Sequence, residues 1–289
     1  MPVWFWVTVF FVYGTVIGSF LNVCIWRMPR EESVVRPPSH CPGCNRRLTA
    51  ADLVPLLSQV LLRGRCRYCG MKISWRYFWV ELLTALAFTA LYFHLGPSGR
   101  WVELVAACLF TAVLIVVFFI DLEHYVIPDI AVYIGVAIGI GKDLLLIHAG
   151  ARPLWRTLPF TTLMVPVPGS LIGLAAGSLG LLLIAKVATL AFRKEAMGMG
   201  DVFLLAAMGA NLSLPCLLLA FFIAVFVGSA AGALLMALRL KGRRDEVPFG
   251  PMLVVGTYVA MLFGEPLIRS YLGLLGLANV TPPACWFAG

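Results

Sequence analysis

Charged residues are scarce in this sequence, and their scarcity excludes a soluble globular domain. Asp, Glu, Lys and Arg together make up 12% of the 289 residues, whereas soluble proteins carry about 25%. Hydrophobic residues reach 61%, and the mean hydropathy is +0.94. Apolar runs long enough to cross a bilayer recur along the chain. Because backbone polar groups in lipid must be satisfied internally, we expect an all-α polytopic membrane protein.

About eight transmembrane helices are expected, with a small polar module between the first two. The first stretch lacks a basic start and a small-residue cleavage site, so it is interpreted as an anchor and not as a cleavable signal peptide. The division between the sixth and seventh spans depends on Asn211, Ser213 and Pro215. The expected spans are 2–26, 78–95, 101–120, 129–148, 169–190, 202–212, 214–238 and 250–275.

Basic residues predict the orientation. In this arrangement sixteen Lys and Arg residues fall on one side of the membrane and five on the other. The richer side is expected to be cytoplasmic, which places the N-terminus outside. The net charge of +8 follows from this topology and from attraction to anionic membrane lipid, so it requires no nucleic acid partner. The sixteen comprise ten residues within 27–77 together with Arg193, Lys194, Arg239, Lys241, Arg243 and Arg244.

The polar module, residues 27–77, contains two C-x-x-C pairs. Cys41 and Cys44 form the first pair, and Cys66 and Cys69 form the second. Four thiolates at this spacing suit a tetrahedral structural zinc, and a reducing cytoplasm favours metal over disulfides. A redox-active pair or two disulfides are the alternatives. Asn45 and Gly70 tolerate the left-handed backbone that each tight turn needs, whereas Cys24, Cys108 and Cys216 are interpreted as small apolar fillers.

Two aspartates at the edges of apolar spans are the main candidates for chemistry. Asp121 closes the 101–120 span, and Asp201 follows the loop containing Gly198 and Gly200. Acids at membrane helices are costly to place and therefore indicate function. The expected topology puts both at the cytoplasmic face, where paired carboxylates that share a proton would activate water and polarise a peptide carbonyl. The two glycines would admit a substrate backbone and adopt dihedrals closed to other residues.

Structural interpretations compete with this hypothesis. Asp201 after a glycine is a good helix N-cap, and Asp121 can be a solvated boundary residue. Asp129 is expected to be mainly structural, in the first turn of a helix that begins at Pro128. Glu123 and His124 are interpreted as loop residues.

Ordered motifs along almost the whole chain resemble the type IV prepilin peptidases, a family of G-x-G-D aspartyl proteases. The first aspartate motif is 121–129, and the glycine–aspartate motif is 195–201. The chain departs from the family at Phe203, where members commonly have Lys. A lysine there would favour the ionised form of Asp201, so its replacement by Phe puts the ionisation of Asp201 in question. The remaining motifs are Gly18-Ser-Phe-Leu-Asn22, Pro37-Pro-Ser-His40-Cys41-Pro-Gly-Cys44, Arg63-Gly64-Arg65-Cys66-Arg-Tyr-Cys69-Gly70, Ile73-Ser-Trp-Arg76-Tyr, Glu81-Leu-Leu-Thr84 and Pro248-Phe-Gly-Pro251.

The resemblance implies a function that spacing alone does not. Asp121 and Asp201 would be catalytic, and the four cysteines would bind zinc. The implied substrates are prepilins and pseudopilins, cleaved at the cytoplasmic face of the bacterial inner membrane, with pilus or secretion machinery as possible partners. S-adenosylmethionine would then methylate the new N-terminus, usually Phe. No glycine fingerprint or other cofactor site supports methyl transfer independently. The implied organisation is helix 1–26, zinc domain 27–77 and peptidase core 78–289.

Three alternatives remain open at this stage. In an ion- or proton-coupled transporter, Asp121 and Asp201 would be ion sites, although transporters place such residues near the bilayer midplane. In a membrane scaffold, the zinc module would dock a partner protein and the aspartates would be dispensable. A relative could also retain only one of the two enzyme activities.

Overall fold

The fold is almost entirely helical and divides into two compact units. The structure is a computed structural model that describes residues 2–150, 155–157, 164–166, 168–192, 198–240, 242, 247–277 and 285. The N-terminal unit covers Met1–Phe119 and the C-terminal unit Ile120–Gly289. Residues outside the described ranges include Arg152, 195–197 of the glycine motif, and five of the counted basic residues: Arg193, Lys194, Lys241, Arg243 and Arg244.

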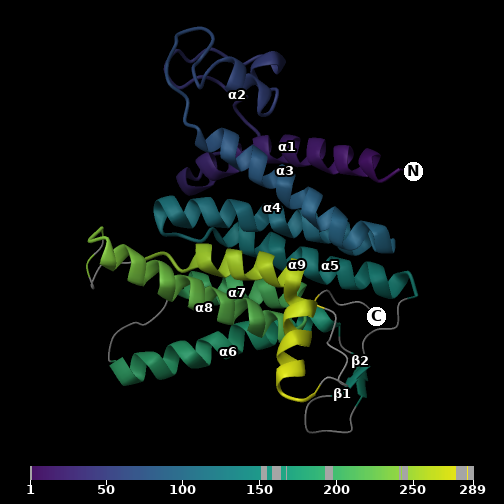
Figure 1. Cartoon of the computed structure of the whole chain (residues 1–289). Helices are drawn as coiled ribbons and strands as arrows, with labels where there is room; N and C mark the ends of the chain where they lie inside the picture. Colours follow the sequence, from purple (N-terminus) through teal and green to yellow (C-terminus); the bar gives the residue numbers. More distant parts are fainter. Residues whose placement is uncertain are drawn as a thin grey trace. The chain divides into compact units, whose positions relative to one another are not determined.

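Figure 1 shows the helices in chain order. The N-terminal unit contains α1 (Val3–Arg27), η1 (Met28–Arg30), η2 (Ala50–Asp52), α2 (Leu57–Leu61), α3 (Arg76–Leu95), η3 (Gly96–Ser98) and most of α4 (Trp101–His124). The C-terminal unit continues with α5 (Asp129–His148), α6 (Gly169–Phe192), α7 (Met199–Asn211), α8 (Leu214–Ala237) and α9 (Gly250–Leu274). Two short antiparallel strands, β1 (Trp155–Thr157) and β2 (Met164–Pro166), lie between α5 and α6.

Seven of the described helices are long and apolar enough to cross a membrane. They correspond to seven of the eight expected spans, and the chain is a multi-pass membrane protein. The eighth, the expected span 202–212, is α7. Its 13 residues extend about 20 Å, less than a hydrocarbon core of about 30 Å. Because nearly every residue of α7 after Phe203 is buried, it is an internal helix.

Two glycines allow α1 and α3 to pack closely in the N-terminal unit. A Cβ at Gly14 would lie 2.5 Å from the Cα of Ala85, and one at Gly18 would lie 2.7 Å from the Cα of Glu81. Membrane helices associate through such small residues because hydrophobic burial gives no driving force within lipid. The polar module begins where α1 ends, and Arg27 there donates hydrogen bonds to two backbone carbonyls of the module, those of Ser33 and Pro37.

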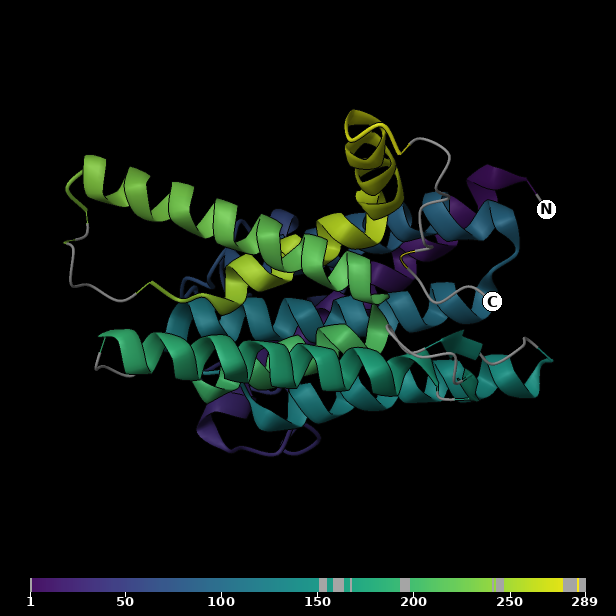
Figure 2. The ribbon, with the colours of Figure 1, turned by 90° about the horizontal axis from the view of Figure 1, so that it is seen from below.

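In the C-terminal unit, small residues let α6 pack directly against α7. Gly173 on α6 and Gly209 on α7 are so close that a Cβ on either would clash with the carbonyl group of the other. Gly177 meets the backbone of Leu205 in the same way. Figure 2 shows α8 and α9 side by side, with α9 sharply bent. The bend is explained by Pro266 inside α9, which cannot donate a helical hydrogen bond.

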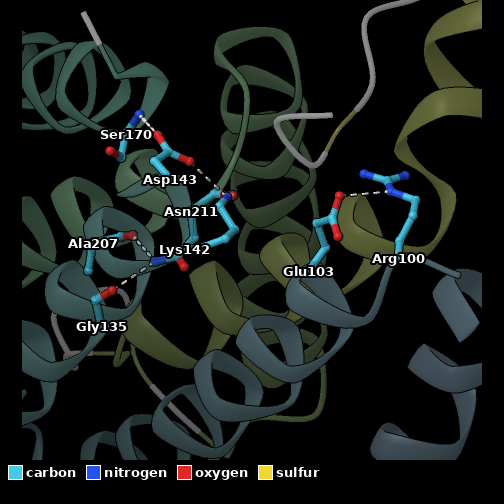
Figure 3. A network of polar contacts seen from close by, with 8 residues as sticks. All are labelled: Arg100, Glu103, Gly135, Lys142, Asp143, Ser170, Ala207 and Asn211. Atoms are coloured by element: carbon cyan, nitrogen blue, oxygen red, sulfur yellow. Dashed lines mark hydrogen bonds and ion pairs between the residues drawn. The ribbon is translucent and has the colours of Figure 1, made fainter. Parts of the chain in front are cut away.

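A buried ionic network joins three helices of the C-terminal unit (Figure 3). The Lys142 ammonium donates to the backbone carbonyl of Asn211 at 3.2 Å and lies 3.8 Å from Asp143 Oδ1. Asp143 Oδ2 accepts a 2.8 Å hydrogen bond from the N–H of Ser170. The cation therefore lies at the C-terminal end of α7 and the anion at the N-terminal end of α6, as the helix dipoles favour.

A disulfide between Cys216 and Cys285 connects the start of α8 to the C-terminal segment. The N–H of Ser213 also donates to the carbonyl of Cys285. The interpretation of Cys216 as an apolar filler was therefore wrong, because its partner lies 69 residues away in the sequence. Cys24 and Cys108 are buried free thiols, as expected.

Candidate active site

Asp121 lies in the last turn of α4 and is almost completely buried, with 5% of its surface exposed. The helix continues to His124, so Asp121 is not a solvated boundary residue. Its Oδ2 atom has no hydrogen-bond partner among the described residues. A buried carboxylate oxygen without a partner is costly in a stable structure. It therefore indicates a site built to receive a proton, water or substrate.

The N-terminus of α9 forms one wall around Asp121. A Cβ at Gly250 would lie 2.5 Å from Asp121 Oδ2, so no residue with a side chain fits there without displacing the acid. The backbone N–H of Gly250 also interacts with the carboxyl group. This N–H belongs to the first turn of α9, where amides have no helical acceptor and favour an anion. It thereby offsets the unfavourable position of Asp121 at the C-terminal end of α4.

Asp201 is the third residue of α7, and Gly198 precedes the helix as its N-cap. The interpretation of Asp201 as the N-cap was therefore wrong. Gly198 has φ −70° and ψ 144°, which any residue can adopt, and Gly200 is helical. The expectation of glycine-only dihedrals was thus also wrong, because both glycines have ordinary backbone geometry. A Cβ at Gly198 would make an ordinary 3.9 Å contact with Asp201 Oδ2, so Gly198 lies directly beside this carboxyl group.

Asp121 and Asp201 lie close enough for their charges to interact. Ile127, in the link between α4 and α5, packs at the same place. A Cβ at Gly200 would lie 3.2 Å from the Cβ of Ile127, and one at Gly250 would lie 3.4 Å from its Cδ1. Ile127 therefore bridges the first turns of α7 and α9. Two acids so placed, beside an apolar side chain, can hold one proton between them.

The sequence analysis did not identify Gly250 and Ile127 as site residues. Gly250 belongs to the Pro248–Pro251 motif, which carried the family resemblance but had no assigned role. Ile127 looked like an ordinary apolar residue before a proline. Asp129 is exposed in the first turn of α5, and Pro128 lies just before that helix instead of being its first residue. Phe203 is 44% exposed and provides no cation near Asp201.

The four cysteines of the polar module converge into one cluster. Their sulfur atoms all lie within 4.8 Å of one another, and Cys41 Sγ lies 3.7 Å from Cys69 Sγ. A tetrahedral zinc with Zn–S bonds of about 2.3 Å separates its sulfurs by about 3.8 Å, so the cluster fits this ion. The two turns are equivalent. Asn45 donates its N–H to the carbonyl of Cys41, and Gly70 donates to Cys66.

Left-handed residues close both turns, as expected: φ is +53° at Asn45 and +71° at Gly70. The backbone N–H groups of Cys69 and Tyr68 lower the pKa of Cys66 to about 7, which favours the thiolate needed for metal binding. Asp52 stabilises the second turn: it forms a 2.8 Å ion pair with Arg67 and accepts a 2.9 Å hydrogen bond from the Tyr68 hydroxyl. The hydroxyl and N–H of Thr49 lower the pKa of Asp52, which keeps it ionised.

Two family models match consecutive parts of the chain. The bacterial peptidase A24 N-terminal domain matches residues 12–95, and the type IV leader peptidase family matches residues 108–233. The first match contains the four cysteines, and the second contains both aspartates. The two aspartates and the cysteine cluster therefore match different family models. They also lie in different structural units.

Relatives match over nearly the whole length. A "prepilin leader peptidase/N-methyltransferase" of Aeromonas hydrophila is 37% identical, covering 93% of this chain and 94% of the relative. A protein of the same name from Bacillus subtilis (strain 168) is 32% identical, with 92% and 97% covered. A "type 4 prepilin-like proteins leader peptide-processing enzyme" of Escherichia coli O78:H11 is 38% identical, with 85% and 89% covered. No solved structure matches the chain. These comparisons give no support to the transporter alternative.

Proposed function

Because this chain belongs to the type IV leader peptidase family, we propose that Asp121 and Asp201 are the catalytic pair with which it cleaves leader peptides from prepilins. The protein is a membrane protease with N-methyltransferase activity. The observation that supports the assignment most strongly is Asp121 Oδ2, buried without a partner and within electrostatic range of Asp201.

The two carboxyl groups would divide the work of peptide hydrolysis. The ionised member takes a proton from water as the water attacks the scissile carbonyl. The protonated member donates a hydrogen bond to that carbonyl and later supplies a proton to the leaving amine. The amide of Gly250 interacts with the carboxyl group of Asp121, and the apolar side chain of Ile127 packs beside Gly250. Gly198 would leave room for the substrate backbone.

The cysteine cluster would hold a structural zinc. Four thiolates leave no open coordination position, so this ion would organise the module and take no part in hydrolysis. When bound, the metal would link the two turns, which also meet where the Arg46 guanidinium lies 4.2 Å from the centroid of the Tyr68 ring. Cys41 and Cys44 in the first turn, and Cys66 and Cys69 in the second, would be its ligands.

The second activity would follow cleavage. S-adenosylmethionine would supply the methyl group, and the acceptor would be the new α-amine of the trimmed substrate. The substrates would include pseudopilins as well as prepilins. The protein would lie in the bacterial inner membrane with its N-terminus periplasmic and both the cysteine cluster and the aspartates at the cytoplasmic face, in contact with membrane lipid and with pilus or secretion machinery.

One assay separates the two activities. Purified enzyme in detergent is incubated with a prepilin and S-adenosylmethionine, and mass spectrometry scores leader removal and methylation of the product. Asp121→Asn and Asp201→Asn should each abolish cleavage yet still methylate a pre-trimmed substrate. Cys41→Ser should lose the metal. Its methylation activity should then be lost more readily than its cleavage activity. Cleavage at near wild-type rate by either Asn variant would contradict the assignment.

A further inference from the structure

The N-terminal unit contains a polar pair that neither the peptidase site nor the cysteine cluster uses. Asn22 on α1 and Glu81 on α3 lie on the packed faces of these two helices and are 1% and 6% exposed. Glu81 is opposite Gly18, one helical turn before Asn22 on α1. Each residue lies five positions from the end of its helix at the polar module, a depth of about 7 Å. The pair is therefore just inside the membrane edge.

The Asn22 amide has a fixed orientation and one free acceptor. Its Nδ2 donates to the carbonyl of Gly18 at 3.3 Å and to the carbonyl of Tyr77 at 3.1 Å. A flipped amide would set its oxygen against both carbonyl oxygens, so the arrangement has one solution. Oδ1 is left buried without a hydrogen-bond partner among the described residues. Such an atom is a vacant acceptor for an N–H or O–H donor.

Glu81 has a firmly positioned carboxyl group. Its Oε2 accepts a 2.8 Å hydrogen bond from the backbone N–H of Leu56 in the polar module, and the Ser19 hydroxyl is nearby. Leu56 has φ +59° and ψ −50°, which a leucine rarely adopts. The residue that donates to Glu81 is thus itself in a strained backbone conformation. Backbone strain of this kind is concentrated at functional sites.

We propose that Asn22 and Glu81 bind the substrate amine for methyl transfer, an inference that rests on the proposed function. The new α-amine is mostly protonated near neutral pH and is then no nucleophile. A cation with several N–H donors can use both a buried carboxylate and a vacant amide oxygen, which Glu81 and Asn22 supply on the packed faces of α3 and α1. Glu81 accepts the proton that makes the amine neutral, and Asn22 Oδ1 accepts an N–H that orients its lone pair. The methyl donor supplies a carbon whose bond to sulfur breaks, with the electron pair leaving on sulfur, as the amine nitrogen bonds to that carbon.

The placement of the two family models agrees with this assignment. The peptidase family model covers 108–233 and contains both aspartates, whereas Asn22 and Glu81 lie in the separate N-terminal model, 12–95. The relatives' names join two activities in one chain. Methyl transfer is therefore assigned to the N-terminal unit, which contains Asn22 and Glu81 but neither aspartate.

Glu81→Gln is the discriminating variant, because a glutamine oxygen still accepts the Leu56 N–H but no longer takes a proton. Methylation of a pre-trimmed substrate should fall at least 100-fold at pH 7 and recover as the pH rises above the substrate amine pKa. Zinc content and leader cleavage should stay within twofold of wild type. Glu103→Gln is the matched control, since Glu103 is also buried in this unit and pairs with Arg100 (Figure 3). Wild-type methylation by Glu81→Gln, or a loss that is uniform with pH, would overturn the proposal.

A binding measurement decides the proposal even if the preparation does not methylate. Two synthetic peptides that begin with Phe, one with a free amine and one N-acetylated, are titrated against full-length enzyme without a methyl donor. Wild type should bind the free amine at least tenfold more tightly. Glu81→Gln and Asn22→Ala should each lose most of that preference. Equal binding of both peptides by wild type, or a preference that survives in Glu81→Gln, would refute the amine site. A wild type that binds selectively yet never methylates would instead contradict the proposed methyltransferase function.

Discussion

Gly250 leaves the space that the carboxyl group of Asp121 occupies, because a Cβ on residue 250 would lie 2.5 Å from Asp121 Oδ2. A residue at the start of α9 thus positions an acid at the end of α4, 129 residues earlier in the sequence. The proposed peptidase site is therefore assembled from the ends of three helices, α4, α7 and α9.

Gly250→Ala should lower leader cleavage about 100-fold, since displacing a catalytic group by an ångström costs about that much. Folding, measured by thermal unfolding in detergent, should change little because the acid can move. Gly232→Ala is the control: it changes a glycine in α8 whose Cβ would meet nothing within 4 Å. Unchanged cleavage by Gly250→Ala would show that the position of Asp121 is not critical.

Metal removal should affect the two activities unequally. Chelation, or Cys44→Ser, should release about one zinc per chain and expose residues 27–77 to limited proteolysis, because the four ligands would join the two turns of the module. Cleavage should persist longer than methylation, since the aspartates lie in the other unit. Elemental analysis and the two-activity assay measure these effects. Full retention of zinc by Cys44→Ser would argue against the four-cysteine site.

Lys142→Met should strongly destabilise the C-terminal unit. It leaves Asp143 buried without its cation, a change that costs about 3–5 kcal/mol in buried pairs. The free energy of unfolding in mixed detergent micelles measures the loss. Lys186→Met provides a control on α6, because Lys186 is exposed. Equal stability of the two variants would mean that the ionic network contributes nothing.

The cysteines should differ in redox state within one chain. In native membranes Cys216 and Cys285 should resist alkylation until a reductant is added, whereas the four cluster cysteines should react once metal is chelated. Cys216→Ser should lower stability by about 2–4 kcal/mol, the usual contribution of a disulfide. Mass spectrometry of alkylated peptides identifies each thiol. Free Cys216 in native membranes would contradict the disulfide with Cys285.

Local patterns in the sequence predicted most helices, the left-handed turns at Asn45 and Gly70, and the aspartates of interest. They failed where partners are distant in the chain. The contact of Gly250 with Asp121, the Cys216 disulfide and the vacant acceptor on Asn22 all depend on how separate helices pack. α7 looked like a span because an internal helix is as apolar as a lipid-facing one. Its length distinguishes the two.

The central claim is that two carboxyl groups share one proton, and the pH dependence of leader cleavage tests it most directly. At low pH both aspartates are protonated and no base remains, whereas at high pH both are ionised and no acid remains. We therefore predict a bell-shaped profile of kcat/KM with two apparent pKa values that belong to the pair. A profile with a single ionisation, or one that stays flat where both groups titrate, would contradict the paired mechanism.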